Sequence, residues 1–191
     1  MADPSRKTTA LHDVELAALA AAGGRAEFGE LVRRHGSAVR GLLRRMGADP
    51  ATADDVAQDA FLRAFENIAE FRGEGTFAAW VKRIAARLYL KRRRRDAALV
   101  LEADPREPED YRAPPLADAA GRIDLDEALK TLSPAERLCV SLCYGAGLSH
   151  SEVAETLQAP LGTIKSHVKR GLDKLKTRLG PDTRAGSRAH G

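Results

Sequence analysis

Two neighbouring segments near the end of the chain carry residues suited to binding a polyanion. The first begins with Ser149 and Glu152, which have the spacing of a capping box, where serine and glutamate satisfy backbone amides at a helix start. The second begins at Gly162, after a gap of four residues that follows Leu157. Its apolar residues recur every three or four positions and predict one buried stripe, formed by Ile164, Val168, Leu172, Leu175 and Leu179. Two helices joined by a short turn are typical of a helix-turn-helix that reads DNA.

The polar positions of the second segment predict the face that would meet a DNA groove. They are Thr163, Lys165, Ser166, His167, Lys169 and Arg170. From residue 160 to 179 there are six lysines and arginines and one acid, Asp173. The alternative is a pair of ordinary surface helices with solvated lysines, but such helices usually mix both signs of charge. The one-sided charge favours nucleic-acid binding.

A second basic block lies in the middle of the chain and also predicts contact with nucleic acid. Between residues 82 and 95 the cations are Lys82, Arg83, Arg87, Lys91, Arg92, Arg93, Arg94 and Arg95, with no acid among them. A targeting signal or a purely solvated basic run is the alternative. The block continues an amphipathic pattern that contains Trp80, which favours a functional surface.

These residues require helices to position them, and the periodicity predicts an all-helical fold with two small domains. The first domain is expected over 25–95. Its helices should run from Ala26 to a stop at Gly47, from Asp49-Pro50 onward, and from a Thr76 cap onward. Inward-facing residues of the second of these helices include Phe65. Residues 1–24 are expected to be a flexible lead-in that is frayed or weakly helical.

The second domain is expected over 123–180, after a flexible linker over 96–122 that is rich in acids and proline. Ser133 and Glu136 form another capping box, and the helix after it should end around Gly145 and Gly147. Residues 181–191 are expected to be a disordered tail.

Composition excludes several classes of function. The chain has 191 residues, a net charge of +4 and a pI near 9.3, which permits a polyanionic partner. Cys139 and Cys143 are expected to be apolar core residues, with a redox or metal role as the alternative. The histidines lack metal-ligand spacing, and no nucleotide-binding loop or catalytic triad occurs, so we expect no enzyme and no cofactor. With no membrane span or signal peptide evident, a cytoplasmic location and no membrane insertion are expected.

With both halves in view, the chain resembles a bacterial sigma factor of the extracytoplasmic-function group of the sigma-70 family. In the first half, Ala53-Asp-Asp-Val-Ala-Gln-Asp-Ala-Phe61 and Phe77-Ala-Ala-Trp80 are similar to family motifs. In the second half, the similar stretches are Leu132-Ser-Pro-Ala-Glu-Arg137, Glu152-Val-Ala-Glu155 and Gly162-Thr-Ile-Lys-Ser166. Helix-turn-helix segments of this kind also end other regulators, so the order of both motif sets in one chain carries the resemblance.

The resemblance implies partners and roles. Asp55, Gln58 and Asp59 would dock on the clamp helices of the polymerase beta-prime subunit. The loop from Phe71 to Thr76 and the helix after it would hold the melted minus-ten element, with basic contacts from Lys82, Arg83, Arg87, Lys91 and Arg92. Trp80 is assigned to the core rather than to base stacking. The helix-turn-helix face would read the minus-35 element and contact the beta flap, and any anti-sigma factor would be a separate chain.

Three positions depart from the family pattern. Arg87 stands where the family usually has Asn, and Lys91 where it often has Asp; an arginine cannot accept a hydrogen bond from a base, so an unusual minus-ten preference is expected. Gln158 replaces a usual glycine in the turn, where a left-handed conformation would cost about 1 kcal/mol.

Two other functions remain as hypotheses. A sigma-like decoy that binds an anti-sigma factor would have no use for basic faces. An ordinary helix-turn-helix regulator would leave the first half of the chain unexplained, and would bind promoter DNA tightly without polymerase.

Overall fold

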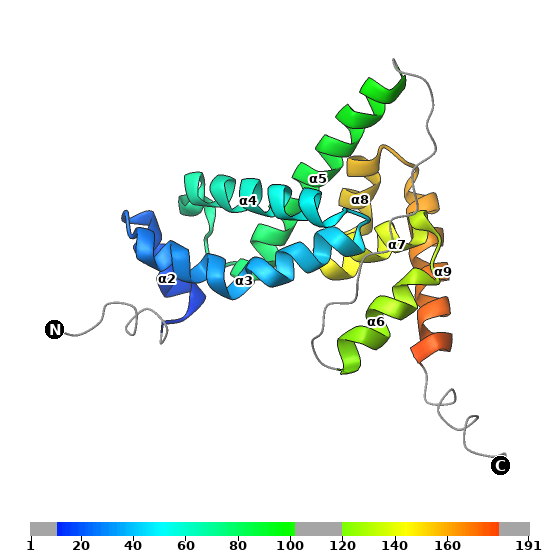
Figure 1. Ribbon diagram of the computed structural model, residues 1–191, viewed down its shortest axis with the longest axis horizontal. Coiled ribbons are helices and arrows are strands. Elements are labelled where there is room, and N and C mark those ends of the chain that lie inside the picture. Colours follow the sequence, from blue (N-terminus) through cyan, green and yellow to red (C-terminus); the bar gives the residue numbers. More distant parts are fainter. Residues whose placement is uncertain (1–10, 102–119, 180–191) are drawn as a thin grey trace, which may run out of the picture. The chain divides into compact units, whose positions relative to one another are not determined.

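The computed structural model describes residues 11–101 and 120–179, and every regular element within these ranges is a helix (Figure 1). The elements are α2 (Asp13–Ala21), α3 (Arg25–Arg45), α4 (Pro50–Glu66), η1 (Ile68–Glu70), α5 (Phe77–Leu101), α6 (Ala120–Lys130), α7 (Pro134–Val140), η2 (Ser141–Gly145), α8 (His150–Leu157) and α9 (Leu161–Leu179). The chain divides into two compact units, of which the first holds α2, most of α3, α4 and α5, and the second α6 to α9. The predicted helical fold with two small units is confirmed.

The first unit is built around α4 and α5, which pack against each other. Its core includes Leu31, Val39, Leu43, Val56 and Val81, each with at most 2% of its surface exposed. The predicted starts of α4 and α5 are confirmed. Asp49 accepts a hydrogen bond from the amide of Thr52 at 2.9 Å, and the Thr76 hydroxyl accepts one from the amide of Ala79 at 3.1 Å.

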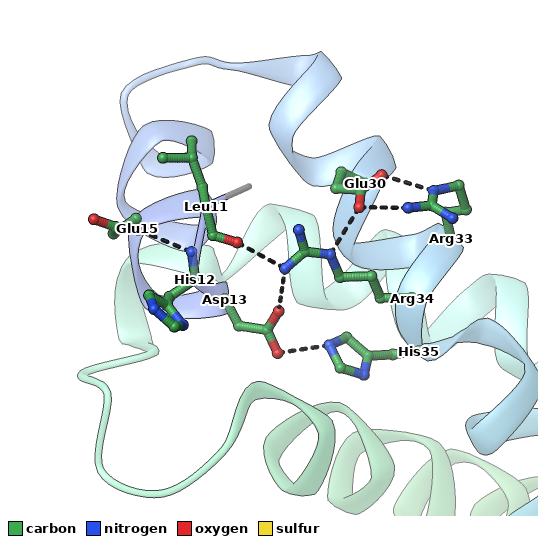
Figure 2. Close-up of polar contacts among 8 residues, drawn as sticks. All are labelled: Leu11, His12, Asp13, Glu15, Glu30, Arg33, Arg34 and His35. Carbon is green, nitrogen blue, oxygen red and sulfur yellow. Dashed lines mark hydrogen bonds and ion pairs between the residues drawn. The ribbon is translucent and has the colours of Figure 1, made fainter. Parts of the chain in front are cut away.

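The helix α2 is regular and packed where a frayed or weakly helical lead-in was predicted, which corrects that prediction for Asp13–Ala21. Leu16, Ala17 and Ala20 are buried in it. The side chain of Asp13 lies between two residues of α3, at 3.0 Å from Arg34 and 2.7 Å from Nε2 of His35, and Arg34 also donates to the carbonyl of Leu11 at 2.8 Å (Figure 2). Local sequence could not reveal this docking, because the partners lie more than twenty residues away and small alanines give a weak periodic signal.

Glu30 completes this network from within α3. Its carboxylate accepts hydrogen bonds from Arg33 and Arg34 at 2.7 Å, although only 8% of the residue is exposed (Figure 2). The two guanidinium groups lower the pKa of Glu30 from 4.5 to about 2, against the opposing effect of burial. Arg34 therefore connects a buried carboxylate of α3 to the start of α2.

The boundaries of the expected linker are also corrected. The helix α5 continues to Leu101 and α6 begins at Ala120, so both ends of the segment 96–122 are helical. The stretch Ala97-Ala98-Leu99 has strong helix propensity and contains no proline or glycine that would stop the helix. The rest of that linker, the first ten residues of the lead-in and the expected tail over 181–191 lie outside the described residues.

The second unit packs α6 and α7 against α9 around Ala128, Leu129, Leu132, Val140 and Leu175. The capping box at Ser133 and Glu136 is confirmed. After Val140 the helix widens into a π-helical turn, η2, which ends at Gly145. The predicted helix end around Gly145 and Gly147 is thus confirmed, and Gly147 has a φ of 72°.

Leu179, predicted to complete the buried stripe of α9, is 46% exposed, because α9 extends beyond the part that packs against its neighbours. Phe65 of the first unit was likewise predicted inward and is 36% exposed, although its ring centroid lies 4.9 Å from that of Phe28.

Gly171 sets how closely α9 approaches α7. A Cβ atom at this position would lie 2.8 Å from Cγ2 of Val140 and 3.5 Å from Cβ of Glu136, so a larger residue would collide with the neighbouring helix. This close approach was missed in the sequence, where a glycine inside a helical pattern shows only a loss of propensity.

We expect Gly171→Val to destabilise the second unit by about 2 kcal/mol, because the added methyl groups overpack the α7–α9 contact. The matched control is Gly162→Val, since an added Cβ there meets nothing within 4 Å. Urea unfolding of both variants measures the difference. Equal free energies of unfolding would show that the α7–α9 contact tolerates a side chain at Gly171.

We also expect Glu30→Gln to lower stability in a pH-dependent way. The folded pKa of Glu30, about 2, lies below its ordinary value of 4.5, so the charged group stabilises the fold above pH 4.5 and this contribution is lost as the pH falls toward 2. Thermal unfolding followed by circular dichroism should therefore show a gap between wild type and variant that narrows from pH 5 to pH 2. The exposed Glu66→Gln serves as control. A gap that stays constant over this range would contradict the role of the carboxylate charge.

Candidate nucleic-acid interface

The helix α9 has the two faces that its sequence predicts. Ile164, Val168 and Leu175 are buried on one side, with 1%, 3% and 8% of their surface exposed. The exposed residues on the other side are Thr163, Lys165, Ser166, Lys169 and Arg170, while His167 is half-buried. The Ser166 hydroxyl donates to the carbonyl of Gly162 at 2.9 Å, so its proton is used within the helix. The predicted DNA face is thus brought together on one helix surface.

The turn before α9 has the predicted strained conformation. Ser149 and Glu152 form the capping box that starts α8, with bonds of 2.8 and 3.2 Å. Gln158 ends α8 with a φ of 52° and a ψ of 43°, in the left-handed region. A glutamine there costs on the order of 1 kcal/mol relative to glycine. The amide of Ala159 donates to the carbonyl of Ala154 at 3.0 Å and holds the turn.

One acid of α7 touches the basic face. Glu136 accepts hydrogen bonds from Lys174 at 2.7 Å and from the amide of Ser133 at 3.0 Å, and it lies 3.9 Å from Nε of Arg170. The Lys174 ammonium and the Ser133 amide lower the pKa of Glu136 although the residue is buried. Arg170, predicted to bind DNA, is therefore also part of an internal contact that sequence reasoning did not find.

The helix α5 presents the other basic block. Its buried side is formed by Phe77, Val81, Ala85, Ala86 and Tyr89. Of the predicted minus-ten residues, Arg83, Arg87 and Lys91 are exposed, and Lys82 and Arg92 are half-buried. The cations therefore lie mainly away from the core, as a surface for phosphates requires.

The helix α4 presents Asp55, Gln58 and Asp59 together on its exposed side. Nη1 of Arg92 lies 3.5 Å from Oδ2 of Asp55, so one residue of the predicted minus-ten set contacts one of the predicted polymerase set. Leu62 follows them with helical spacing and is 57% exposed, a large apolar residue outside the buried stripe. The helical spacing of positions 55, 58, 59 and 62 could have placed Leu62 on the same exposed side of α4 as the predicted polymerase-binding residues.

An aromatic cluster fixes the loop before α5. The ring centroid of Trp80 lies 5.5 Å from that of Phe71 and 5.7 Å from that of Phe77. Trp80 is half-buried, so it packs in the predicted core cluster while keeping part of its surface exposed. The loop from Phe71 to Thr76 is thereby held at the start of the basic helix.

The cysteines show no sign of reactive chemistry. Burial raises the pKa of Cys139 to about 11 and also raises the pKa of Cys143, which makes both thiolates scarce at neutral pH. Within residues 11–101 and 120–179 no cluster of three His, Cys, Asp or Glu side chains could hold a metal ion. Nor does any helix in these ranges have the length and apolarity needed to cross a membrane.

Comparison with known proteins identifies both halves. The family model for sigma-70 region 2 matches residues 31–98, and that for sigma-70 region 4 matches residues 128–177. The extracytoplasmic-function (ECF) RNA polymerase sigma factor SigM of Mycobacterium tuberculosis (strain ATCC 25618 / H37Rv) is 32% identical over 173 residues, covering 88% of this chain and 85% of SigM. The chain belongs to the ECF sigma factors of the sigma-70 family. This family is non-enzymatic, which confirms that expectation.

Other known proteins are also similar to this sigma factor in sequence or in fold. SigE of Mycolicibacterium smegmatis, also an ECF sigma factor, is 35% identical over 159 residues; the match covers 78% of this chain and 60% of SigE, so the chain spans less than two thirds of that relative. The solved structure of CnrH in complex with the cytosolic domain of CnrY has 30% identity and a TM-score of 0.51, covering 89% of this chain and 98% of CnrH. The sigma factor RpoE of Bartonella quintana, solved with the anti-sigma factor NepR, shares the fold with a TM-score of 0.58, at 24% identity and coverage of 82% and 98%.

Proposed function

We propose that this sigma factor binds core RNA polymerase and directs it to promoters, with α4 on the clamp helices of the beta-prime subunit, α5 on the melted minus-ten strand and α9 in the minus-35 major groove. The observation that carries the proposal is the presence of both sigma regions in one chain, each with a basic helix whose cations face away from its core. Two weak binding units in one chain raise each other's effective concentration on a promoter.

The side chains of α4 support the polymerase contact. Asp55, Gln58 and Asp59 are exposed without belonging to the apolar core, and Leu62 adds an exposed apolar residue to the same surface. A polar rim around an apolar anchor is the composition of many protein interfaces. We propose that this surface, together with a contact of the second unit to the beta flap, recruits the chain to polymerase in the cytoplasm.

The basic helices support the DNA contacts. Lys165, Lys169 and the half-buried His167 lie where a recognition helix meets bases and phosphates, and Arg83, Arg87 and Lys91 offer phosphate contacts along α5. Because Arg87 has donors only, we propose that minus-ten recognition by this chain differs from that of relatives with Asn at this position. The exposed cations also argue against the decoy hypothesis, since a decoy needs no DNA face.

We propose regulation by a separate anti-sigma factor. The similar sigma factor RpoE was solved in complex with the anti-sigma factor NepR, and CnrH in complex with the cytosolic domain of CnrY.

We expect Gln58→Ala with Asp59→Ala to weaken polymerase binding by about 2 kcal/mol, because interface anchors contribute energies of this size. This pair leaves the Asp55–Arg92 contact intact. Co-elution with core polymerase and run-off transcription on DNA flanking the chain's own gene measure the loss, and Glu70→Ala, which removes one exposed carboxylate outside α4, is the control. A folded double variant that co-elutes and transcribes like wild type would remove the clamp assignment.

We expect Lys169→Ala to change the affinity for all promoters and Lys165→Ala to change the preference among them. Lys169→Ala should weaken binding to all promoters alike and flatten the salt dependence by about 0.9 in log K against log salt, the amount expected for one phosphate contact. Lys165→Ala lies nearer the start of α9 and should change preference among minus-35 variants by about 1 to 3 kcal/mol. Binding of the polymerase complex to promoter variants at several salt concentrations measures both. If neither variant changes affinity or preference, α9 does not read DNA.

A further inference from the structure

Glu136 occupies an unusual place for a carboxylate near a DNA face. Its side chain is only 6% exposed, and its Cβ would lie 3.5 Å from a Cβ atom added at Gly171 of α9. Oε2 accepts the amide of Ser133 at 3.0 Å and the ammonium of Lys174 at 2.7 Å, while Oε1 faces Nε of Arg170 at 3.9 Å. One buried anion thus contacts two cations that flank Gly171 on α9.

Arg170 extends this contact to His167. Its Nη2 lies 3.2 Å from Nδ1 of His167, one helical turn away. A guanidinium has donors only, so Nδ1 is the acceptor in this contact, which corresponds to the imidazole tautomer with its proton on Nε2. A chain of contacts therefore runs from Glu136 through Arg170 to a residue of the predicted base-reading face, and leaves that residue with an N–H donor.

A donor on His167 would suit an acceptor on a base edge, such as N7 of a purine. At the same time, Arg170 and Lys174 are partly neutralised by Glu136, which limits their attraction to phosphates in general. Both effects favour sequence preference over uniform affinity, and both depend on the negative charge of Glu136.

We propose that Glu136 is a positioning residue for DNA reading by α9, which holds Arg170 and Lys174 and, through Arg170, fixes the orientation and tautomer of His167. This inference rests on the proposed function, in which α9 contacts the minus-35 element. Glu136 itself is buried under α9 and acts through the residues that it binds.

The test is Glu136→Gln in the full chain, assembled with core polymerase, on a promoter library randomised at the minus-35 element. The amide oxygen can still accept the Ser133 amide, so the helix cap is kept while the charge is lost. We expect the salt dependence to steepen by about one to two units, since each added phosphate contact contributes about 0.9. We expect preference among minus-35 variants to fall by about fivefold, the lower range for one base contact.

Glu127→Gln is the matched control, because it removes one carboxylate that contacts Lys130 on α6 and has no described contact with α9. If Glu136→Gln equals Glu127→Gln in preference and salt dependence while Lys165→Ala changes preference, the role of Glu136 is overturned and the DNA face stands. If Lys165→Ala changes nothing either, the proposed function of α9 fails, and this inference with it.

If Glu136→Gln does not fold, a second pair of variants tests whether the contact between Arg170 and His167 contributes to minus-35 preference. Arg170→Gln and Lys174→Gln each remove one positive charge from a partner of Glu136, but only Arg170 contacts His167. Arg170→Gln should lower minus-35 preference by about fivefold and Lys174→Gln should leave it unchanged. Equal preference in these two variants would overturn the proposal.

Discussion

Each basic helix of this sigma factor depends on the burial of a narrow apolar stripe along its opposite side. In α5 the stripe contains Phe77, Val81 and Ala85, and in α9 it contains Ile164, Val168 and Leu175. Charged side chains cannot be buried without partners, so fixing the stripe also fixes where the cations lie. The remaining contacts, from the aromatic cluster around Trp80 to the close approach at Gly171, determine how accurately these helices are held.

A few acidic residues contact cations of the two basic helices and partly neutralise their charge. Asp55 contacts Arg92 in the first unit, and Glu136 contacts Lys174 and lies near Arg170 in the second. The first contact is exposed, and such pairs contribute little to stability. In the second, the Glu136 side chain is buried while those of Lys174 and Arg170 are 50% and 60% exposed, so removal of a cation would leave a buried carboxylate with less compensation and should cost more. We therefore regard Glu136 as part of the architecture that supports the proposed DNA face, and the Asp55–Arg92 pair as a surface contact of little weight for stability.

Much of the fold could be predicted from local signals. The helix starts and the periodic stripes depend on residues that are close together in sequence. The structure confirms the helix starts at Asp49, Thr76, Ser133 and Ser149. The docking of α2 depends on contacts between Asp13 and α3, and the packing at Gly171 depends on Val140, so no local pattern could reveal either. Leu179 was assigned to the core because periodicity does not show where the neighbouring helices end. The predicted site residues on α4, α5 and α9 are mostly exposed as expected, whereas the exposure of Leu62 and the contacts of Glu136 with α9 were not predicted.

The central claim is that both basic faces contact promoter DNA in one polymerase complex, and site-specific photocrosslinking tests it most directly. A photoreactive amino acid would replace Lys165 in one variant and Arg87 in another, each in the full chain with core polymerase on promoter DNA. The account predicts that the first crosslinks to the minus-35 duplex and the second to the non-template strand of the minus-ten element, and that both crosslinks require core polymerase. Crosslinks from both positions to protein alone, or the same DNA crosslinks without polymerase, would contradict it.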